Sequence, residues 1–566
     1  MTTTKQIQVS KNELDKVQYL TEVLPEIPTN TILYKKLTGL GATYGEITAK
    51  RNSIIIEPNV PVIIGKCNDP KHKDDNLFGV YEGVYTDDIV NYLEKSKNKY
   101  YKILTTPESF QKVKDAFEEL EMSAQCSCFL LFDECHKLVK DADYRSDITL
   151  PIDDFFKFDQ KALVSATPIE LNDPRFKEQN FQTIEIQPTF DYKKEIWLHH
   201  TNNTLQAFKN VLSKLNNEEA APLPICVFIN STDIIYSLMK QLDLLEESAV
   251  FCAPKSVDKL KKNRFCNVYE QWNKDKMKRY NFFTSRFFNA VDMELEEQPH
   301  VIMLTDVYFA EHTMIDPYTD AIQIVGRFRN GVSSITYISN TKKGLPQRSK
   351  EEIKGYLICS KEIYRTMKNF YDCATDRASR DAYRAALESL PFNRMLDRNG
   401  RENWFAIDNY MDEELMKNYF YDENSLYKAY DNCDSFIVYH AGYYCPLGDS
   451  ERLKRENKSQ SIKDKRKEIV RQLEMLGVCA GFFPWNKVLY FLFFALMIAA
   501  VIALFKMYLE RNMKDRLYYL GEYLWDVFRC GRWKLYFAGE REGAGAGICM
   551  AGPVFCSALM YMGGMY

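Results

Sequence analysis

CFLLFDECHK, residues 128–137, is the stretch from which the fold of this chain can be worked out. Its first five residues are apolar, and the run ends abruptly at Asp133 and Glu134. A short, continuous apolar run with a polar stop is typical of a strand buried on both faces of a parallel sheet. In such sheets the loops just after the strands carry the functional groups. We therefore expect both carboxylates to lie at a functional edge of a sheet.

Runs of the same kind occur on both sides of this stretch. They are NSIIIEP (52–58), YKILTTP (101–107) and KALVSAT (161–167), and a second set consists of PICVFIN (224–230), HVIMLTD (300–306), AIQIVGRFRNG (321–331) and SITYISN (334–340). Residues 87–99 and 108–122 have apolar residues at helical spacing instead. Strands that alternate with helices predict an α/β fold with two doubly wound domains, residues 24–190 and 191–345.

The composition changes after the second domain. A segment rich in Gly, Pro, Ser and charge, residues 339–352, predicts a linker. Residues 346–480 are rich in helix formers and predict a mainly helical accessory domain. Residues 481–566 form a hydrophobic tail, in which 488–505 is a run of 18 residues without charge. This run is just long enough to cross a membrane, and its alternatives are a buried core helix and a tail from a fusion or altered reading frame.

The bulk numbers restrict the class of protein. The 566 residues are 46% hydrophobic, which is enough for several folded domains. A net charge of -4 neither requires nor excludes a nucleic-acid partner, so any phosphate-binding surface must be a local patch. The 15 cysteines show no CxxC pair, and the pattern of the first twenty residues predicts no signal peptide. We therefore expect a cytoplasmic protein, with membrane association through 488–505 as an alternative.

TGLGAT, residues 38–43, has the outline of a phosphate-binding loop. Thr38, Gly39, Gly41 and Thr43 keep the parts that aim main-chain N–H groups at an anion. Ala42 stands where such a loop carries the lysine that reaches the β and γ oxygens of a nucleotide. Loss of that ammonium predicts hydrolysis slowed by about ten- to a thousandfold.

Two lysines lie just before the loop. Lys35 or Lys36 could fold back and supply the missing charge. Alternatively, both are solvated residues at the end of an edge strand, and this second interpretation is favoured because lysines are rarely buried.

Asp133 and Glu134 fit a nucleotide site. A carboxylate at a strand end can hold Mg²⁺, and a second beside it can orient or deprotonate the attacking water. Two further polar stretches follow apolar runs, SATP at residues 165–168 and QIVGRFRN at residues 323–330.

Taken together, the TGxGxT loop, the DECH box, the SAT motif and the QxxGR motif resemble a superfamily 2 helicase of the DEAD/DEAH type. The resemblance covers residues 28–345 and implies two RecA-like domains that bind ATP and Mg²⁺ between them, with single-stranded nucleic acid across the top. It implies that Asp133 and Thr43 bind Mg²⁺ and that Glu134 orients the water. It further implies coupling of the ATP site to the nucleic-acid side through His136, Ser165 and Thr167.

The resemblance also assigns roles to other residues. Thr105, Thr106 and Thr305 fall where the family contacts the nucleic-acid backbone. Gln323, Arg327 and Arg329 would face the γ-phosphate. Many members have the two arginines three residues apart, whereas Asn330 occupies that position here; Arg329 is kept as the arginine finger.

A basic stretch with interleaved aromatic residues lies in the second domain. Its members are Lys255, Lys259, Lys261, Lys262, Arg264, Lys274, Lys276, Lys278 and Arg279, with Phe265, Tyr269 and Trp272 between them. Such a stretch can track phosphates and stack bases, although solvated helix faces are also basic.

These patterns predict an ATP-dependent helicase or translocase that acts on single- or double-stranded nucleic acid, with DNA favoured. The alternative is a non-hydrolysing clamp that ATP closes on nucleic acid. A restriction-type translocase would need a nuclease site, and no nuclease constellation is recognisable in the sequence.

Overall fold

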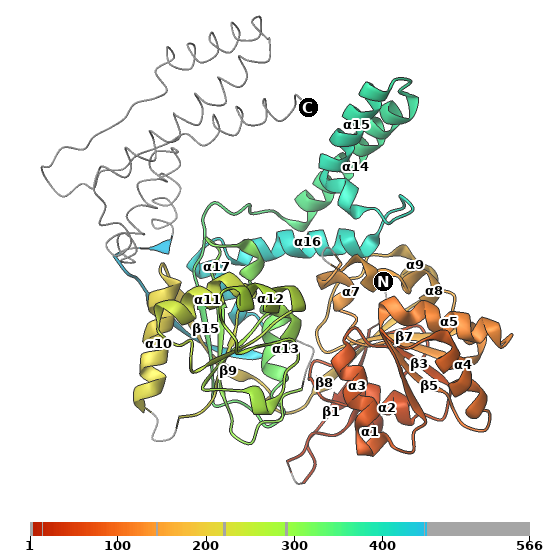
Figure 1. Ribbon diagram of the computed structural model, residues 1–566, viewed down its shortest axis with the longest axis horizontal. Coiled ribbons are helices and arrows are strands. Elements are labelled where there is room, and N and C mark those ends of the chain that lie inside the picture. The colour runs from red at the N-terminus through yellow and green to blue at the C-terminus, as the bar shows by residue number, and fades with distance from the viewer. Residues whose placement is uncertain are drawn as a thin grey trace, which may run out of the picture. The chain divides into compact units, whose positions relative to one another are not determined.

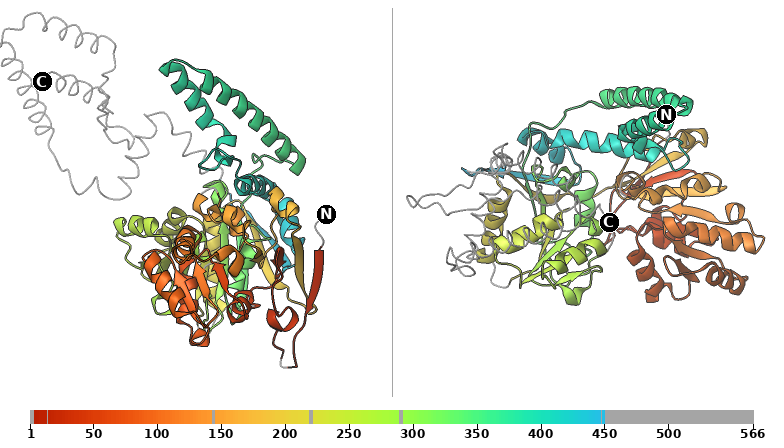
Figure 2. Two further views of the ribbon diagram at one scale, coloured as in Figure 1. Left: turned by 90° about the vertical axis from the view of Figure 1, so that its right-hand side faces the viewer. Right: turned by 45° about the horizontal axis from the view of Figure 1, so that its top comes forward.

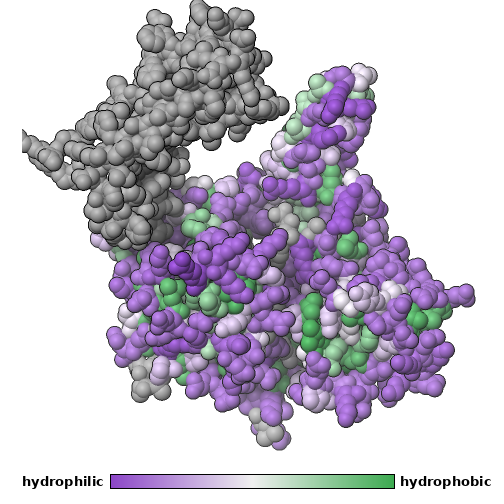
Figure 3. Space-filling model, in the orientation of Figure 1, coloured by the Kyte–Doolittle hydropathy of each residue, from purple (hydrophilic) through white to green (hydrophobic). Residues whose placement is uncertain are grey.

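The fold was derived from a computed structural model that describes residues 4–449, except 14, 143–144, 219–221, 289–291 and 447. Two parallel sheets of eight strands, each with helices, are followed by a helical region (Figure 1). This confirms the predicted fold class. The hydrophobic tail and the run 488–505 lie outside the described residues. In the described part, no helix has both the length and the apolar character needed to cross a membrane, and hydrophilic side chains cover most of the face shown in Figure 3.

The first sheet has the strand order β1-β8-β2-β7-β6-β3-β5-β4, with parallel pairing throughout. Its strands are β1 (Thr4–Val9), β2 (Thr31–Tyr34), β3 (Ser53–Ile56), β4 (Leu77–Val80), β5 (Lys102–Thr105), β6 (Phe129–Phe132), β7 (Gln160–Ser165) and β8 (Gln182–Pro188). Its helices are α1 (Leu20–Val23), α2 (Ala42–Thr48), α3 (Val60–Asn68), α4 (Thr86–Lys95), α5 (Phe110–Glu119), α6 (Ala124–Ser127), α7 (Lys137–Lys140), α8 (Ile152–Phe155) and α9 (Pro174–Glu178). The four apolar runs predicted as strands in this domain are β3, β5, β6 and β7.

The second sheet has the order β12-β11-β13-β10-β14-β15-β9-β16, again parallel. Its strands are β9 (Lys194–Thr201), β10 (Ile225–Phe228), β11 (Ser248–Phe251), β12 (Val268–Tyr269), β13 (Tyr280–Phe283), β14 (His300–Thr305), β15 (Ser334–Ser339) and β16 (Phe436–Tyr443). Its helices are α10 (Thr204–Glu218), α11 (Thr232–Gln241), α12 (Pro254–Lys262) and α13 (Asp320–Gly326). Three of the four runs in the second set are strands, whereas AIQIVGRFRNG begins as helix α13; a short apolar run alone does not distinguish a buried helix from a strand.

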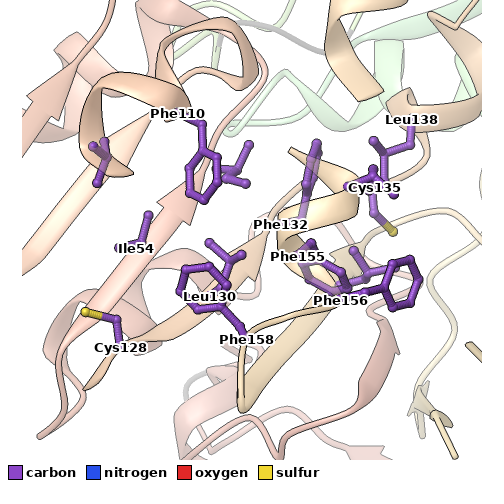
Figure 4. Packing of buried hydrophobic residues seen from close by; sticks show 14 of the residues in the cluster. Ile54, Phe110, Cys128, Leu130, Phe132, Cys135, Leu138, Phe155, Phe156 and Phe158 are labelled. Atoms are coloured by element: carbon purple, nitrogen blue, oxygen red, sulfur yellow. The ribbon is translucent and has the colours of Figure 1, made fainter. Parts of the chain in front are cut away.

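Aromatic residues fill much of the first core. Leu130 and Phe132 of β6 are fully buried and lie beside Phe155, Phe156 and Phe158 (Figure 4). Because side chains alternate across a strand, the neighbouring Phe129 and Leu131 face the other layer of helices. Burial on both faces is the physical reason why β6 is a continuous apolar run, and it holds the residues that follow β6 in place.

The C-terminal region contains α14 (Lys350–Cys373), α15 (Arg377–Ser389), α16 (Trp404–Tyr419) and α17 (Glu423–Asp431). Helices α14 and α15 lie side by side in both views (Figures 1 and 2), with the rings of Phe370 and Tyr383 stacked 5.8 Å apart. Phe405 of α16 belongs to the core of the first domain, whereas Tyr430 of α17 and Phe436 of β16 belong to a core of the second. The chain thus returns to both domains after leaving them, and β16 extends the second sheet with residues from the region 346–480.

We expect Phe405→Ala to lower the stability of the first domain by about 3–5 kcal/mol, because it leaves a cavity in a closed core. Thermal denaturation followed by circular dichroism would measure the loss. The matched control is Phe370→Ala on α14, whose side chain is 52% exposed and should change the midpoint little. Equal effects of the two substitutions would contradict a packing role for Phe405.

Candidate functional site

The TGLGAT loop connects β2 to α2. Gly39 and Gly41 have φ angles of 78° and 80°, a left-handed conformation that glycine adopts without strain. Helix α2 begins at Ala42, which is buried. The hydroxyl of Thr43, one residue into the helix, donates a hydrogen bond to Oδ2 of Asp133. The loop and the strand end of β6 therefore meet at one carboxylate.

Lys35 also faces that carboxylate. Strand β2 lies between β8 and β7 and is not an edge strand, so the prediction that both lysines are solvated strand ends is wrong for Lys35. Its main-chain N–H donates to the carbonyl of Ser165, its side chain is 8% exposed, and its Nζ lies 3.6 Å from Oδ1 of Asp133. Lys36 points elsewhere, with its Nζ 2.9 Å from Oε1 of Gln187 on β8.

Three carboxyl groups gather at the ends of β3 and β6. The N–H of Asp133 donates to the carbonyl of Ile56, which places Asp133 and Glu134 beside Glu57. Burial, together with the charge of Asp133, raises the pKa of Glu57 to about 8. Burial alone would lower the pKa of Lys35, but Asp133 and Glu134 outweigh it and hold that pKa above its ordinary value. The ammonium of Lys35 is therefore charged at neutral pH.

Glu134 connects the two domains. Its Oε2 lies 3.3 Å from Nδ1 of His136 and accepts a 3.3 Å hydrogen bond from Nε2 of Gln323 on α13. Its Oε1 lies 3.8 Å from a guanidinium nitrogen of Arg327. Burial would raise the pKa of Glu134, but the hydrogen bond to His136 and the charges of Lys35 and Arg327 hold it well below its ordinary value. Glu134 is thus an ionised acceptor, suited to orienting a water molecule more than to taking a proton from it.

The predicted coupling residues lie in one chain of contacts. Nδ1 of His136 is 3.0 Å from the hydroxyl of Ser165 at the end of β7. That hydroxyl accepts the main-chain N–H of Thr167 at 3.1 Å, and all three side chains are buried. A movement of Glu134 or His136 would be transmitted to the loop after β7 through these contacts.

The predicted arginines approach from the second domain. Arg327 donates to Oε1 of Gln323 at 2.6 Å, and Arg329 donates to Asp292 at 2.7 Å. The guanidinium of Arg329 lies over the loop, since a Cβ added to Gly39 would clash with its Nη1 atom. Asp292 also lies 3.5 Å from Arg327, a partner that the sequence did not suggest because nothing in its neighbourhood resembles a motif.

Thr38 forms a second contact between the loop and α13. Its hydroxyl donates to the carbonyl of Gly326 at 3.1 Å. The first and second domains therefore touch directly at the loop.

The donor set fits Mg²⁺. Asp133 and Thr43 offer a carboxylate and a hydroxyl in direct contact, and Mg²⁺ prefers oxygen ligands, with one or two carboxylates completed by phosphates and water. Among the described residues, no group of three or more His, Cys, Asp or Glu side chains could hold a metal ion.

The three threonines predicted to contact nucleic acid are buried. Thr105 donates to the carbonyl of Thr106, and the hydroxyl of Thr106 caps the turn at Ser109. Thr305 donates to the carbonyl of Thr313 and accepts from Tyr337. These hydroxyls stabilise strand ends, and a contact with nucleic acid at these positions stays a prediction.

Several side chains of the basic stretch in the second domain already form contacts within the protein, which the sequence alone does not indicate. Phe265 is buried in a core, and Tyr269 and Trp272 pack against another. Lys259 pairs with Asp233 at 2.6 Å, and Lys274 pairs with Glu296 at 2.6 Å. The aromatic residues therefore serve packing, which removes Phe265 as a platform for base stacking.

No protein-family profile matches the chain, and no curated protein resembles it in sequence. Solved structures do resemble it. Dbp5 of S. cerevisiae bound to RNA and ADP BeF3 is 13% identical, over 69% of this chain and 90% of that one, with a TM-score of 0.36. The Mycobacterium smegmatis helicase Lhr bound to ssDNA and AMP-PNP is 12% identical, over 67% of this chain and 57% of that one, with a TM-score of 0.35.

A DEAD box protein from the hyperthermophile Methanococcus jannaschii is 14% identical, over 55% of this chain and 82% of that one, with a TM-score of 0.29. The similarity is one of fold, and the function proposed below rests on the residues of this chain.

A partly buried lysine connects the site to the second domain and to α16. Lys140, at the end of α7, lies 2.5 Å from Asp316 of the second domain and 2.6 Å from Asp412 of α16. Burial would raise the pKa of Asp316, but Lys140 holds it below its ordinary value. Burial raises the pKa of the neighbouring Asp320 to about 6. One ammonium thus compensates a group of acids contributed by two separate parts of the chain.

We expect Lys140→Met to lower stability by about 3–5 kcal/mol, since it leaves the buried Asp316 and the partly buried Asp412 without their cation. Thermal denaturation midpoints at pH 7 would measure it. Lys157→Met is the control, because Lys157 is 61% exposed and its pair with Asp154 should contribute less than about 1 kcal/mol. A Lys140→Met protein as stable as the control would show that the aspartates do not depend on Lys140.

Proposed function

We propose that this chain is an ATP-dependent nucleic-acid helicase or translocase of superfamily 2 that acts on DNA in the cytoplasm. The observation that carries the proposal is the meeting of Glu134, at the end of β6, with Gln323 and Arg327 of α13. The site is formed by four segments that are far apart in the sequence. They are the TGLGAT loop, the DECH carboxylates, the SAT residues and the arginines after α13.

Hydrolysis would use these residues as follows. The phosphates of ATP would lie at the TGLGAT loop, and Asp133 and Thr43 would hold Mg²⁺. Mg²⁺, when bound, neutralises charge on the phosphate oxygens. Glu134 orients a water whose oxygen attacks the γ-phosphorus. The bond from that phosphorus to the β–γ bridging oxygen breaks and releases ADP. One proton of the water stays on the inorganic phosphate, and the other is lost to solvent.

The second domain would supply positive charge to the same reaction. Arg327 and Arg329 reach the first domain at Glu134 and Gly39, respectively. Their guanidinium groups can stabilise the charge that spreads over the γ-phosphate oxygens. Because these arginines belong to the second domain, loss of the γ-phosphate would weaken the contact between the domains, and this is how hydrolysis would move bound nucleic acid.

Ala42 favours a second candidate function, an ATP-gated clamp that binds nucleic acid without hydrolysing ATP. The phosphate loop would then bind ATP through its main chain alone, and binding would bring the arginines to the phosphates. Ionised Glu134 and paired Arg327 weigh against the clamp, because binding alone does not require a water-orienting carboxylate.

Glu134→Gln is expected to reduce Mg²⁺-dependent ATP turnover of the full chain by at least about a hundredfold, because the amide cannot orient water as the carboxylate does. Turnover is measured as phosphate release, without nucleic acid and with single-stranded DNA or RNA of equal length. Glu119→Gln, an exposed residue of α5, is the control and should behave as the wild type.

Three outcomes separate the hypotheses. Turnover that DNA stimulates more than RNA supports the proposal. Nucleotide binding without turnover in the wild type favours the clamp. Absence of both binding and turnover would refute nucleotide chemistry at this site altogether.

A further inference from the structure

We infer that Lys35 supplies the ammonium that the TGLGAT loop lacks at Ala42 and that it binds the β- and γ-phosphate oxygens of ATP. The inference rests on the proposed function, in that it assumes a nucleotide at this loop. It assigns to Lys35, the first residue after β2, the role that the sequence pattern gives to a lysine inside the loop.

The contacts of Asp133 show that Lys35 lies close to the start of α2. Its Oδ2 accepts the hydroxyl of Thr43, one residue beyond Ala42, and its Oδ1 lies 3.6 Å from Nζ of Lys35. The ammonium of Lys35 and the first turn of α2 therefore lie at the same carboxylate. Ala42 directly precedes Thr43, so Lys35 lies at the carboxylate that contacts the residue next to the missing lysine.

The ammonium is available to another acceptor. At 3.6 Å, its distance from Asp133 exceeds that of a direct hydrogen bond. Among the described residues, Lys35 forms an ion pair with Asp133. No hydrogen-bond acceptor in this part of the chain contacts Nζ of Lys35. A lysine has three donors on a flexible stem of four carbons, so a small rotation brings Nζ to a phosphate.

Two neighbouring groups are less suited to the task. Lys36 is committed to Gln187 on the other side of β2. Arg329 is held by Asp292 and the carbonyl of Gly326 and belongs to the second domain, so it reaches the loop only when the domains are in contact. Lys35 belongs to the same domain as the loop and can bind the nucleotide in any arrangement of the two domains.

The competing interpretation is that Lys35 is only a counter-ion that makes a buried Asp133 tolerable. Both interpretations predict some loss of stability when the charge is removed. They differ in whether Lys35 touches the nucleotide, and in whether a lysine at position 42 can take over its task.

The first experiment uses the unmodified full chain and a biotinylated acyl phosphate of ATP. A lysine amine at the phosphates loses a proton to solvent and attacks the acyl carbon, which forms an amide on Nζ and releases ATP. Digestion and mass spectrometry are expected to find the label on Lys35, and excess ATP should prevent it. Label that ATP displaces from other lysines, with Lys35 unmodified, would overturn the inference.

The second experiment compares variants of the full chain. Lys35→Met is expected to weaken binding of a fluorescent ATP analogue or to slow turnover by about ten- to a hundredfold, whereas Lys36→Met should change either by less than about twofold. The double variant Lys35→Met/Ala42→Lys should recover most of the loss, because the charge returns to the same phosphates. Far-UV circular dichroism and the denaturation midpoint report on folding.

The outcomes distinguish this inference from the proposed function. Wild-type turnover that is unchanged in Lys35→Met refutes the role of Lys35 and leaves the enzyme proposal intact. A loss in Lys35→Met that Ala42→Lys does not restore assigns Lys35 to Asp133 alone. If the wild type neither binds nor hydrolyses ATP, the proposed function fails. If Lys35→Met does not fold, the labelling of the wild type decides.

Discussion

Negative charge is concentrated where β3 and β6 end, and the rest of the site is arranged around it. Glu57, Asp133 and Glu134 are contributed by two adjacent strands, and each would be strongly destabilising as an unpaired buried anion. The cost of burying these groups is reduced in three ways. Burial raises the pKa of Glu57, Asp133 pairs with Lys35, and Glu134 contacts His136 and Arg327. Because Arg327 belongs to the second domain, the charge balance of the first domain depends on contact with the second.

Under the proposed function, this balance of charges explains how a phosphate loop without its lysine could bind a nucleotide. Lys35, Arg327 and Arg329 each pair with a carboxylate, and under the proposed function they would exchange it for phosphate oxygens. Mg²⁺ at Asp133 would replace the positive charge that Lys35 withdraws. A buried cation held at 3.6 Å, and not in a tight pair, costs less to redirect than one with a full set of hydrogen bonds.

Movement of the two domains is restricted by the C-terminal helices. Phe405 of α16 is buried in the core of the first domain, while Tyr430 of α17 is buried in a core of the second. The segment that joins α16 to α17 is therefore anchored to both domains. Lys140 adds a polar link next to the DECH box, since α7 follows it directly. Opening of the site therefore requires either bending between α16 and α17 or breaking the ion pairs of Lys140.

The sequence by itself determined the strands that carry the site and the residues at their ends. Strands β3, β5, β6 and β7 are continuous apolar runs because both faces are buried, and polar residues such as Asp133 and Ser165 mark the edge where parallel strands stop. The sequence also placed Glu134, Gln323 and Arg327 in one predicted site, through the order of their motifs. Only the tertiary structure decided that Lys35 points inward and Lys36 outward, that Arg329 lies over Gly39, and that α16 enters the first core. These facts depend on strand order and on contacts between segments far apart in the chain, whereas the local pattern that predicts a strand contains no information about its neighbours.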